Sequence, residues 1–359
     1  MGDYQDLPSK YVDHFNEKKT LLSYGELYNK GMDRTRESNA LDLLDVGGET
    51  KSQNRLNREY IESLTFEMRL LDSVFSSTET TIFGHKVPYP IQCSAYCDGR
   101  FLNRVAQHWQ ASYLEEIAEG VAEAGTWLWA GHVGTQMLQR MINTGAPVVR
   151  IVKPFASKNR DESNDIIYLL KDAEDRGCVA VGMDIDIFYG EKTGDEYPYR
   201  YPFGPKGMDE MRRFVEATKL PFIVKGVLSV SDALKCREIG AKALMVSHHG
   251  GEAVDYAVPI LRVLPHIKQA VPDMTIFVDT GFRRGTDILK ALALGADAVC
   301  VLTILMIAYA GYGKRGVTDM LYNLAAELRR NMSICGCPTI ANIDPSIIWY
   351  PYPDKRRGE

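Results

Sequence analysis

The sequence predicts an α/β fold of the (β/α)8 TIM-barrel type, on three observations. Eight short apolar segments have the length and composition of buried strands. Amphipathic helical patterns separate most of these segments, which is typical of parallel βαβ units. The chain has 359 residues, enough for one barrel with an added N-terminal region.

The expected strands are apolar runs bounded by glycine or polar residues. They are residues 88–96, 125–131, 146–153, 178–186, 220–226, 241–247, 274–280 and 296–302. Helical patterns such as SYLEEIAEGVAEA and GTDILKALALG place apolar residues three and four positions apart. Several of these patterns end in glycine, a common helix stop. Eight strands with intervening helices close naturally into a barrel.

Three regions are expected along the chain. Residues 1–80 are polar and charged and should form an N-terminal helical extension, residues 81–345 the barrel, and residues 346–359 a C-terminal tail. A long connection after the fourth strand, residues 187–207, is rich in Gly, Tyr and Pro. Loops of this length are usually functional or mobile, so it is a candidate active-site lid; a simple surface insertion is the alternative.

The composition excludes several classes of function. The formal net charge is -5 and the pI about 5.9, which argues against a nucleic-acid partner. We find no apolar run suited to span a bilayer and no signal-peptide core, so we expect a cytoplasmic protein that does not bind membranes. The seven cysteines are expected to be small buried hydrophobes, with no metal site.

Four ionisable residues stand at or just after the ends of expected strands: Lys225, His249, Asp279 and Arg283. Parallel strands all end on the same side of a barrel, so these side chains should converge on one face. His249, followed by two glycines, suits a base that reaches a substrate. Lys225 suits either stabilisation of a negative charge or a Schiff base, and the residues alone do not separate these two.

The loop after the seventh strand has the features of an anion site. It contains Asp279, Gly281, Arg283 and Gly285 and runs into a helix start near Thr286. Glycines allow close approach of the backbone, and an arginine fork binds phosphate oxygens. Barrels commonly hold phosphate at this place.

Several stretches resemble the FMN-dependent α-hydroxy acid oxidases and dehydrogenases, a family that includes glycolate oxidase and lactate oxidase. They are GGETKSQNRLN, TTIFGHKVPYPI, LPFIVKGV, VSHHGG, VDTGFRRGTDILKALALGADAV and LAAELRRNM. The resemblance runs from about residue 44 to residue 340. It implies a barrel with FMN across the C-terminal mouth.

The resemblance also implies roles for single residues. His249 is the expected base, with electrons passing to flavin N5, and Asp184 is the residue expected to orient it. Lys225 is expected beside the flavin N1 and O2 edge. The implied FMN contacts are Ser94, Arg150, Lys225, Ser247, Asp279, Gly281, Arg283 and Thr303.

The chain departs from the family pattern where the substrate binds. Glu252 stands in place of the arginine that clamps the substrate carboxylate, and two carboxylates repel each other. Leu44 and Val152 stand in place of two substrate tyrosines, Arg150 in place of a glutamine, and Glu191 and Lys192 in place of a second arginine. Leu302 and Thr303 replace a Gly-Arg pair at the phosphate.

These features together predict an FMN-dependent oxidoreductase that acts on an atypical small-molecule substrate, with Glu252 as a further catalytic residue. Two alternatives remain open. One is isomerase or lyase chemistry without net redox change, in which His249 and Glu252 form an acid/base pair. The other is a non-catalytic homologue. The resemblance implies a homo-oligomer, a tetramer or larger.

Overall fold

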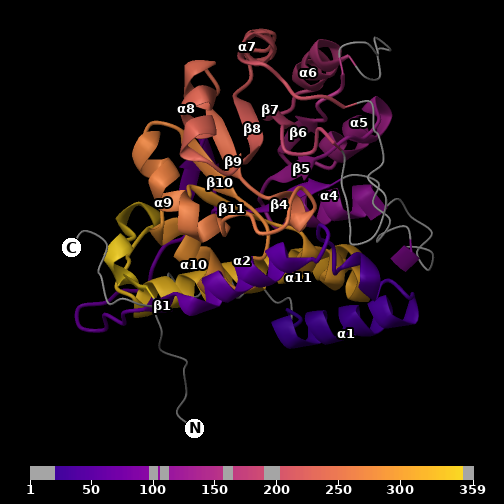
Figure 1. Cartoon of the computed structure of the whole chain (residues 1–359). Helices are drawn as coiled ribbons and strands as arrows, with labels where there is room; N and C mark the ends of the chain where they lie inside the picture. The colour runs from indigo at the N-terminus through magenta and orange to yellow at the C-terminus, as the bar shows by residue number, and fades with distance from the viewer. Residues whose placement is uncertain (1–20, 97–103, 106–112, 157–164, 190–202, 351–359) are drawn as a thin grey trace.

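A computed structural model describes residues 21–96, 104–105, 113–156, 165–189 and 203–350. Within them, eight parallel strands form a closed barrel in the order β10-β11-β4-β5-β6-β7-β8-β9 (Figure 1). The predicted (β/α)8 barrel is confirmed, and every strand overlaps one of the eight expected segments. The strands are β4 (Ile91–Tyr96), β5 (Leu128–Ala130), β6 (Val148–Val152), β7 (Ala180–Asp184), β8 (Phe222–Val227), β9 (Ala243–Val246), β10 (Thr275–Val278) and β11 (Ala298–Val301).

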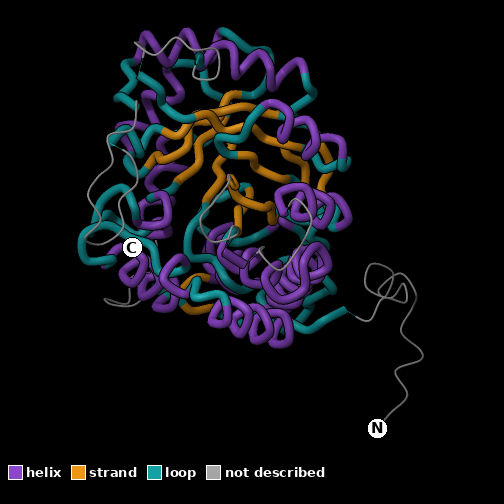
Figure 2. The backbone as a smooth tube through the Cα atoms, turned by 90° about the vertical axis from the view of Figure 1, so that its right-hand side faces the viewer, coloured by secondary structure: helices purple, strands orange, loops and turns teal. Residues whose placement is uncertain are grey.

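Helices enclose the barrel on its outside (Figure 2). The last α-helix along the chain, α11, is kinked, because Tyr312 and Gly313 within it have non-helical backbone angles. The enclosing helices are α4 (Tyr113–Glu123), α5 (Thr135–Asn143), α6 (Ile166–Asp175), α7 (Met208–Glu216), α8 (Val230–Glu238), α9 (Ile260–Ala270), α10 (Gly285–Ala293) and α11 (Thr303–Ile334).

The N-terminal region packs on the barrel through two helices, α1 (Tyr24–Glu37) and α2 (Ser52–Ser63). Helix α1 lies directly against α11, where a Cβ atom on Gly31 would come 1.9 Å from the carbonyl oxygen of Ile307. The absence of that atom lets the two helix backbones touch. Two short strands, β1 (Thr65–Phe66) and β12 (Ile348–Trp349), pair antiparallel and join the N-terminal region to the C-terminal end of the described chain.

The bottom of the barrel is closed by the hairpin of β2 (Thr80–Ile82) and β3 (His85–Val87). Phe83 at its turn contacts the rings of Trp127 and Phe277, which point into the barrel. The pole opposite this hairpin is therefore the open one. Strand ends with polar side chains lie at that pole.

Side chains of the barrel strands alternate between two packing layers, as the pleat of a strand requires. The interior cluster holds Val149 and Ile151 of β6, whereas Val148 and Val152 belong to the outer cluster that packs against the helices. The same alternation continues to the C-terminal end of each strand. There the inward positions are polar: Ser94, Lys153, Asp184, Lys225, Ser247 and Asp279.

Some sequence-based expectations concern residues that the structure does not describe. The candidate lid spans residues 187–207, of which 190–202, including Glu191 and Lys192, lie outside the described residues. The cysteines that are described are buried free thiols. In the described part of the chain, no helix combines the length and the apolar character that crossing a membrane requires.

Candidate active site

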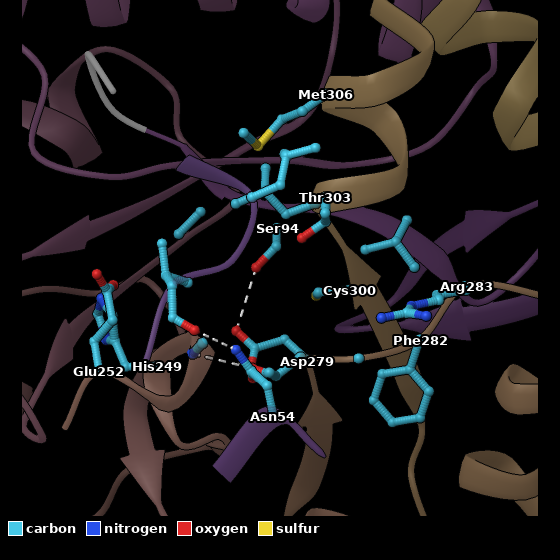
Figure 3. Close-up of a pocket in the computed structure, with 18 of the residues that line it drawn as sticks. Asn54, Ser94, His249, Glu252, Asp279, Phe282, Arg283, Cys300, Thr303 and Met306 are labelled. Atoms are coloured by element: carbon cyan, nitrogen blue, oxygen red, sulfur yellow. Dashed lines mark hydrogen bonds between the residues drawn. The ribbon is translucent and has the colours of Figure 1, made fainter. Parts of the chain in front are cut away.

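A cavity of about 380 Å³ opens at the C-terminal mouth of the barrel (Figure 3). It brings together the four strand-end residues Lys225, His249, Asp279 and Arg283. The size and the mixture of apolar and polar walls are those of small-molecule sites. Residues of the N-terminal region form part of the wall: Leu43, Leu44, Asp45, Val46, Asn54 and Arg58.

His249 is carried by a tight turn that follows β9. His249 itself has φ of 51°, and Gly250 and Gly251 follow with φ of 68° and 87°. Such left-handed conformations are costly for most residues but free for glycine, so the HHGG sequence is suited to this turn. The His249 amide donates to Ser247 Oγ at 3.1 Å. The backbone of Gly251 accepts a bond from the Gly48 amide at 2.8 Å, which ties the N-terminal region to the site.

Two lysines hold one buried carboxylate in the floor of the site. Lys225 Nζ lies 2.9 Å from Asp184 Oδ1, and Lys153 Nζ lies 3.1 Å from Asp184 Oδ2. All three side chains are almost fully buried. Burial works against charge on Asp184, but Lys153 and Lys225 hold its pKa below the usual range. The three groups together carry one net positive charge into the floor.

The His249 ring is surrounded by charged groups on its Nδ1 side. Nδ1 lies 3.1 Å from Asp186 Oδ1, 3.2 Å from Lys225 Nζ and 3.8 Å from Asp184 Oδ1. Burial and Lys225 both oppose protonation, but Asp186 and Asp184 outweigh them and raise the pKa of His249 to about 9. For neighbouring His248 burial is the larger effect: it outweighs the opposing influence of Asp279 and Asp186 and lowers the pKa to about 4.

No metal ion is needed to balance these carboxylates. Asp184, Asp186 and His249 offer ligand atoms within 4.8 Å of one another. The ammonium of Lys225 already contacts two of these three groups. A lysine therefore supplies the positive charge that a cation would bring.

The other end of the cavity has a different character. Asp279 Oδ2 accepts from Ser94 Oγ at 3.3 Å, and Asp279 Oδ1 accepts from Thr280 Oγ1 at 3.0 Å. Arg283 lies beyond them, on the side away from His249 and Glu252 (Figure 3). Among the described residues no carboxylate forms an ion pair with the Arg283 guanidinium. Its charge is thus available to an anion.

The Arg283 loop is held in place from behind. Asp287 Oδ2 accepts from the backbone amides of Arg283 and Arg284 at 2.9 and 3.3 Å. Arg58 of α2 binds both oxygens of Asp287, at 2.8 and 2.9 Å, and the carbonyl of Gly281 at 3.0 Å. This arrangement fixes the loop without using the Arg283 side chain.

The donor set suits an elongated anionic group such as FMN. Lys225 supplies a buried cation beside His249, and Arg283 supplies a cation on the side of the cavity away from His249 (Figure 3). Thr303 and Met306, at the start of α11, also line the wall. A helix start directs free amides at a negative group. The cavity is therefore chemically fitted to a flavin with a terminal phosphate.

Most residues expected from the sequence meet at this cavity. Its wall contains Ser94, Lys225, His249, Glu252, Asp279, Gly281, Arg283 and Thr303. Asp184 and Ser247 lie just behind it, bonded to Lys225 and to the His249 amide. Leu44 and Leu302 also line the wall, at positions where the family pattern has a tyrosine and a glycine.

The structure does not bring Arg150 to the cavity. Arg150 pairs in register with Ala130 and Val181, and both belong to the outer cluster that faces the helices. Its Nη2 donates to the carbonyl of Val133 at 2.7 Å. The expectation of a flavin contact placed Arg150 on the wrong face of β6.

Two residues that the sequence patterns above did not single out enter the site instead. Lys153 and Asp186 each continue the inward alternation of their strand, after Ile151 and Asp184. Counting in steps of two from an inward residue would have identified both. Asn54, which also lines the wall, arrives from α2 and has no comparable signal.

Comparison with known proteins agrees with this geometry. A family model described as FMN-dependent dehydrogenase matches residues 32–208 and 205–350. The chain belongs to this family. It is 30% identical over 300 residues to 2-hydroxyacid oxidase 1 of Mus musculus, which covers 75% of this chain and 80% of that protein. It is 28% identical over 345 residues to glycolate oxidase 3 of Arabidopsis thaliana, covering 84% and 89%.

Solved structures of mandelate oxidase have the same fold. The structure with (S)-2-phenylpropionate has a TM-score of 0.79 and 28% identity, covering 91% of this chain and 98% of that one. A mandelate oxidase variant with the monooxide FMN adduct has a TM-score of 0.76 and 28% identity, covering 89% and 100%. This member of the family is an FMN-dependent oxidoreductase, and FMN is its cofactor.

Proposed function

We propose that this protein oxidises a small molecule that it holds through an amine or hydroxyl group, with His249 as the base. The observation that carries the proposal is Glu252, a carboxylate in the cavity wall beside His249 (Figure 3). Two like charges 4 Å apart repel by about 4 kcal/mol at a partly solvated site. A substrate carboxylate is therefore disfavoured where the family arginine would bind it.

His249 takes one proton from the substrate in this proposal. Its Nδ1 contacts Asp186 and Lys225, and in this proposal Nε2 is the nitrogen that faces the substrate. Bound FMN would accept the two electrons together with the second hydrogen, so that the substrate loses two hydrogens in all. Because the surrounding carboxylates stabilise the imidazolium, the ring retains the proton that it receives.

Lys225, Asp279 and Arg283 are the proposed holders of FMN. The buried ammonium of Lys225 is placed to stabilise negative charge on the reduced ring system, and Arg283 is placed to bind the phosphate. Ser94 of β4, two strands away from β10 in the barrel, donates a hydrogen bond to Asp279 at 3.3 Å. The loss of the Gly-Arg pair at Leu302 and Thr303 leaves Arg283 as the principal cation at this end.

Isomerase or lyase chemistry is a second candidate because His249 and Glu252 line the same cavity. Two ionisable groups in unlike surroundings can serve as acid and base without net electron transfer. The mass of the product separates the two reactions. Oxidation removes two hydrogens, whereas isomerisation leaves the mass unchanged.

The visible spectrum of the purified protein tests the proposal. Oxidised flavin absorbance should be present on purification. Anaerobic addition of small amino alcohols and uncharged hydroxyl compounds should bleach it, and simple 2-hydroxy acids should not. A protein that stays colourless with added FMN, or that is bleached only by 2-hydroxy acids, would refute the proposal.

A further inference from the structure

The Nδ1 atom of His249 has two competing partners of opposite character. Asp186 Oδ1, at 3.1 Å, accepts hydrogen bonds, whereas the Lys225 ammonium, at 3.2 Å, only donates them. If Nδ1 carries a hydrogen it bonds to Asp186, and if Nδ1 is bare it accepts from Lys225. The two arrangements leave opposite hydrogen-bonding states at Nε2, the nitrogen that faces the substrate.

Asp184, the carboxylate expected to orient His249, is engaged elsewhere. Its two oxygens lie 2.9 Å from Lys225 Nζ and 3.1 Å from Lys153 Nζ. Its distance to His249 Nδ1 is 3.8 Å, which exceeds hydrogen-bond length. Because Lys225 and Lys153 already satisfy this carboxylate, Asp184 serves the lysines rather than the histidine.

Asp186 is fitted to its position by the neighbouring strand. Gly226 of β8 has φ of 97°, and a Cβ atom there would lie 2.4 Å from Asp186 Cγ. Only glycine leaves room for this carboxylate. The Asp186 side chain is 9% exposed. Its Oδ2 is buried and has no hydrogen-bond partner in the described part of the chain, so the Oδ1 bond to His249 is its main stabilising contact.

We propose that Asp186 is the positioning residue of His249, accepting the Nδ1 hydrogen and presenting Nε2 to the substrate. Asp184 instead neutralises the two lysines. This inference rests on the proposed function for its catalytic meaning, but the pairing itself is a property of the protein without substrate. Charged groups face the ring from four residues: Lys153 just after β6, Asp184 at the end of β7, Asp186 just after it, and Lys225 of β8.

Nitrogen-15 NMR of histidine in the FMN-loaded protein tests the pairing directly. The His249 signal is assigned by its loss in His249→Gln and followed from pH 5 to pH 10. Above the pKa of the ring, the neutral form should carry its hydrogen on Nδ1. A neutral ring with the hydrogen on Nε2 would overturn the proposal, and this measurement needs no variant that changes Asp186.

Two matched variants extend the test. Asp186→Asn removes one charge at nearly constant shape and should lower the pKa of His249 by roughly one to three units. Asp184→Asn should lower it less, because that carboxylate is farther away and shared with two lysines. Asp186→Glu, which keeps the negative charge, should give a His249 pKa between those of the wild type and Asp186→Asn. An unchanged His249 titration in Asp186→Asn, or a larger effect of Asp184→Asn, would contradict the proposal.

Failure of this inference is distinguishable from failure of the proposed function. If no candidate substrate bleaches the flavin but the neutral His249 ring carries its hydrogen on Nδ1, then the Asp186–His249 pairing is supported and the proposed oxidation is wrong. If bleaching occurs but the hydrogen lies on Nε2, the reaction stands and Asp186 is not the positioning residue.

Discussion

Asp184 and Lys225 are direct register partners on the adjacent strands β7 and β8, and their charged atoms lie 2.9 Å apart. The barrel thus places a carboxylate and an ammonium group side by side in the floor of the site. Because both are buried, removal of one leaves the other poorly compensated. Loss of one partner of a buried ion pair typically costs about 3–5 kcal/mol.

Lys225→Met should therefore lower the free energy of unfolding by about 3–5 kcal/mol. The loss should be smaller to the extent that Lys153, which also pairs with Asp184, still compensates its charge. Urea unfolding at saturating FMN measures the change. Lys268→Met is the matched control: its pair with Asp297, at 3.2 Å, is considerably more exposed. The control should lose less than about 1 kcal/mol. Equal losses in both variants would show that the floor pair has no special role.

Activity should rise with pH up to about 9. A base must be unprotonated to accept a proton, and the nearby carboxylates raise the pKa of His249 to about 9. The rate of anaerobic flavin reduction at low substrate concentration, followed from pH 6 to pH 10, reports this group. A profile that is flat between pH 7 and pH 10 would contradict the assignment of His249 as the base.

The two arginines of the β10 loop should differ in their effect on FMN. Arg283 lines the cavity, whereas Arg284 binds Glu327 and stacks on Tyr24 at 4.0 Å. Arg283→Met should weaken FMN binding by roughly 10- to 100-fold, the worth of one hydrogen bond to a charged group. Arg284→Met should leave the FMN dissociation constant nearly unchanged. Fluorescence titration with FMN compares them.

Arg150→Met tests the placement of Arg150 outside the site. Arg150 is buried, and among the residues that the structure describes its Nε and Nη1 atoms have no hydrogen-bond partner. Replacing a poorly compensated buried charge by an apolar chain of similar length is often neutral or stabilising. We expect unchanged or higher thermal stability and unchanged FMN affinity. A loss of FMN affinity above tenfold would return Arg150 to the cofactor site.

The fold could be read from the sequence because buried parallel strands are continuous apolar runs separated by helical periodicity. The strand-end residues followed from the same logic, and Lys225, His249, Asp279 and Arg283 do share one cavity. Each of these residues stands at or just after the end of one strand. Local patterns carry that information directly.

The errors within the site concern which face a side chain occupies. Arg150 was placed by its resemblance to a family position, although it stands between Val149 and Ile151, which face the interior. Strict alternation from those two residues leads to Lys153. Asp186 follows Asp184 by the same step of two. Contacts made by the N-terminal region, such as that of Asn54, depend on packing over long sequence separations and leave no local pattern.

In the proposed function, Glu252 directs the flavin site towards a substrate that carries no carboxylate beside His249. The most direct measurement compares anaerobic flavin reduction by a 2-hydroxy acid in the wild type, Glu252→Gln and Glu252→Arg. We predict negligible reduction in the wild type, a small gain in Glu252→Gln from lost repulsion, and a gain of roughly 10- to 100-fold over Glu252→Gln in Glu252→Arg. Rapid reduction in the wild type that Glu252→Arg does not increase would contradict the claim.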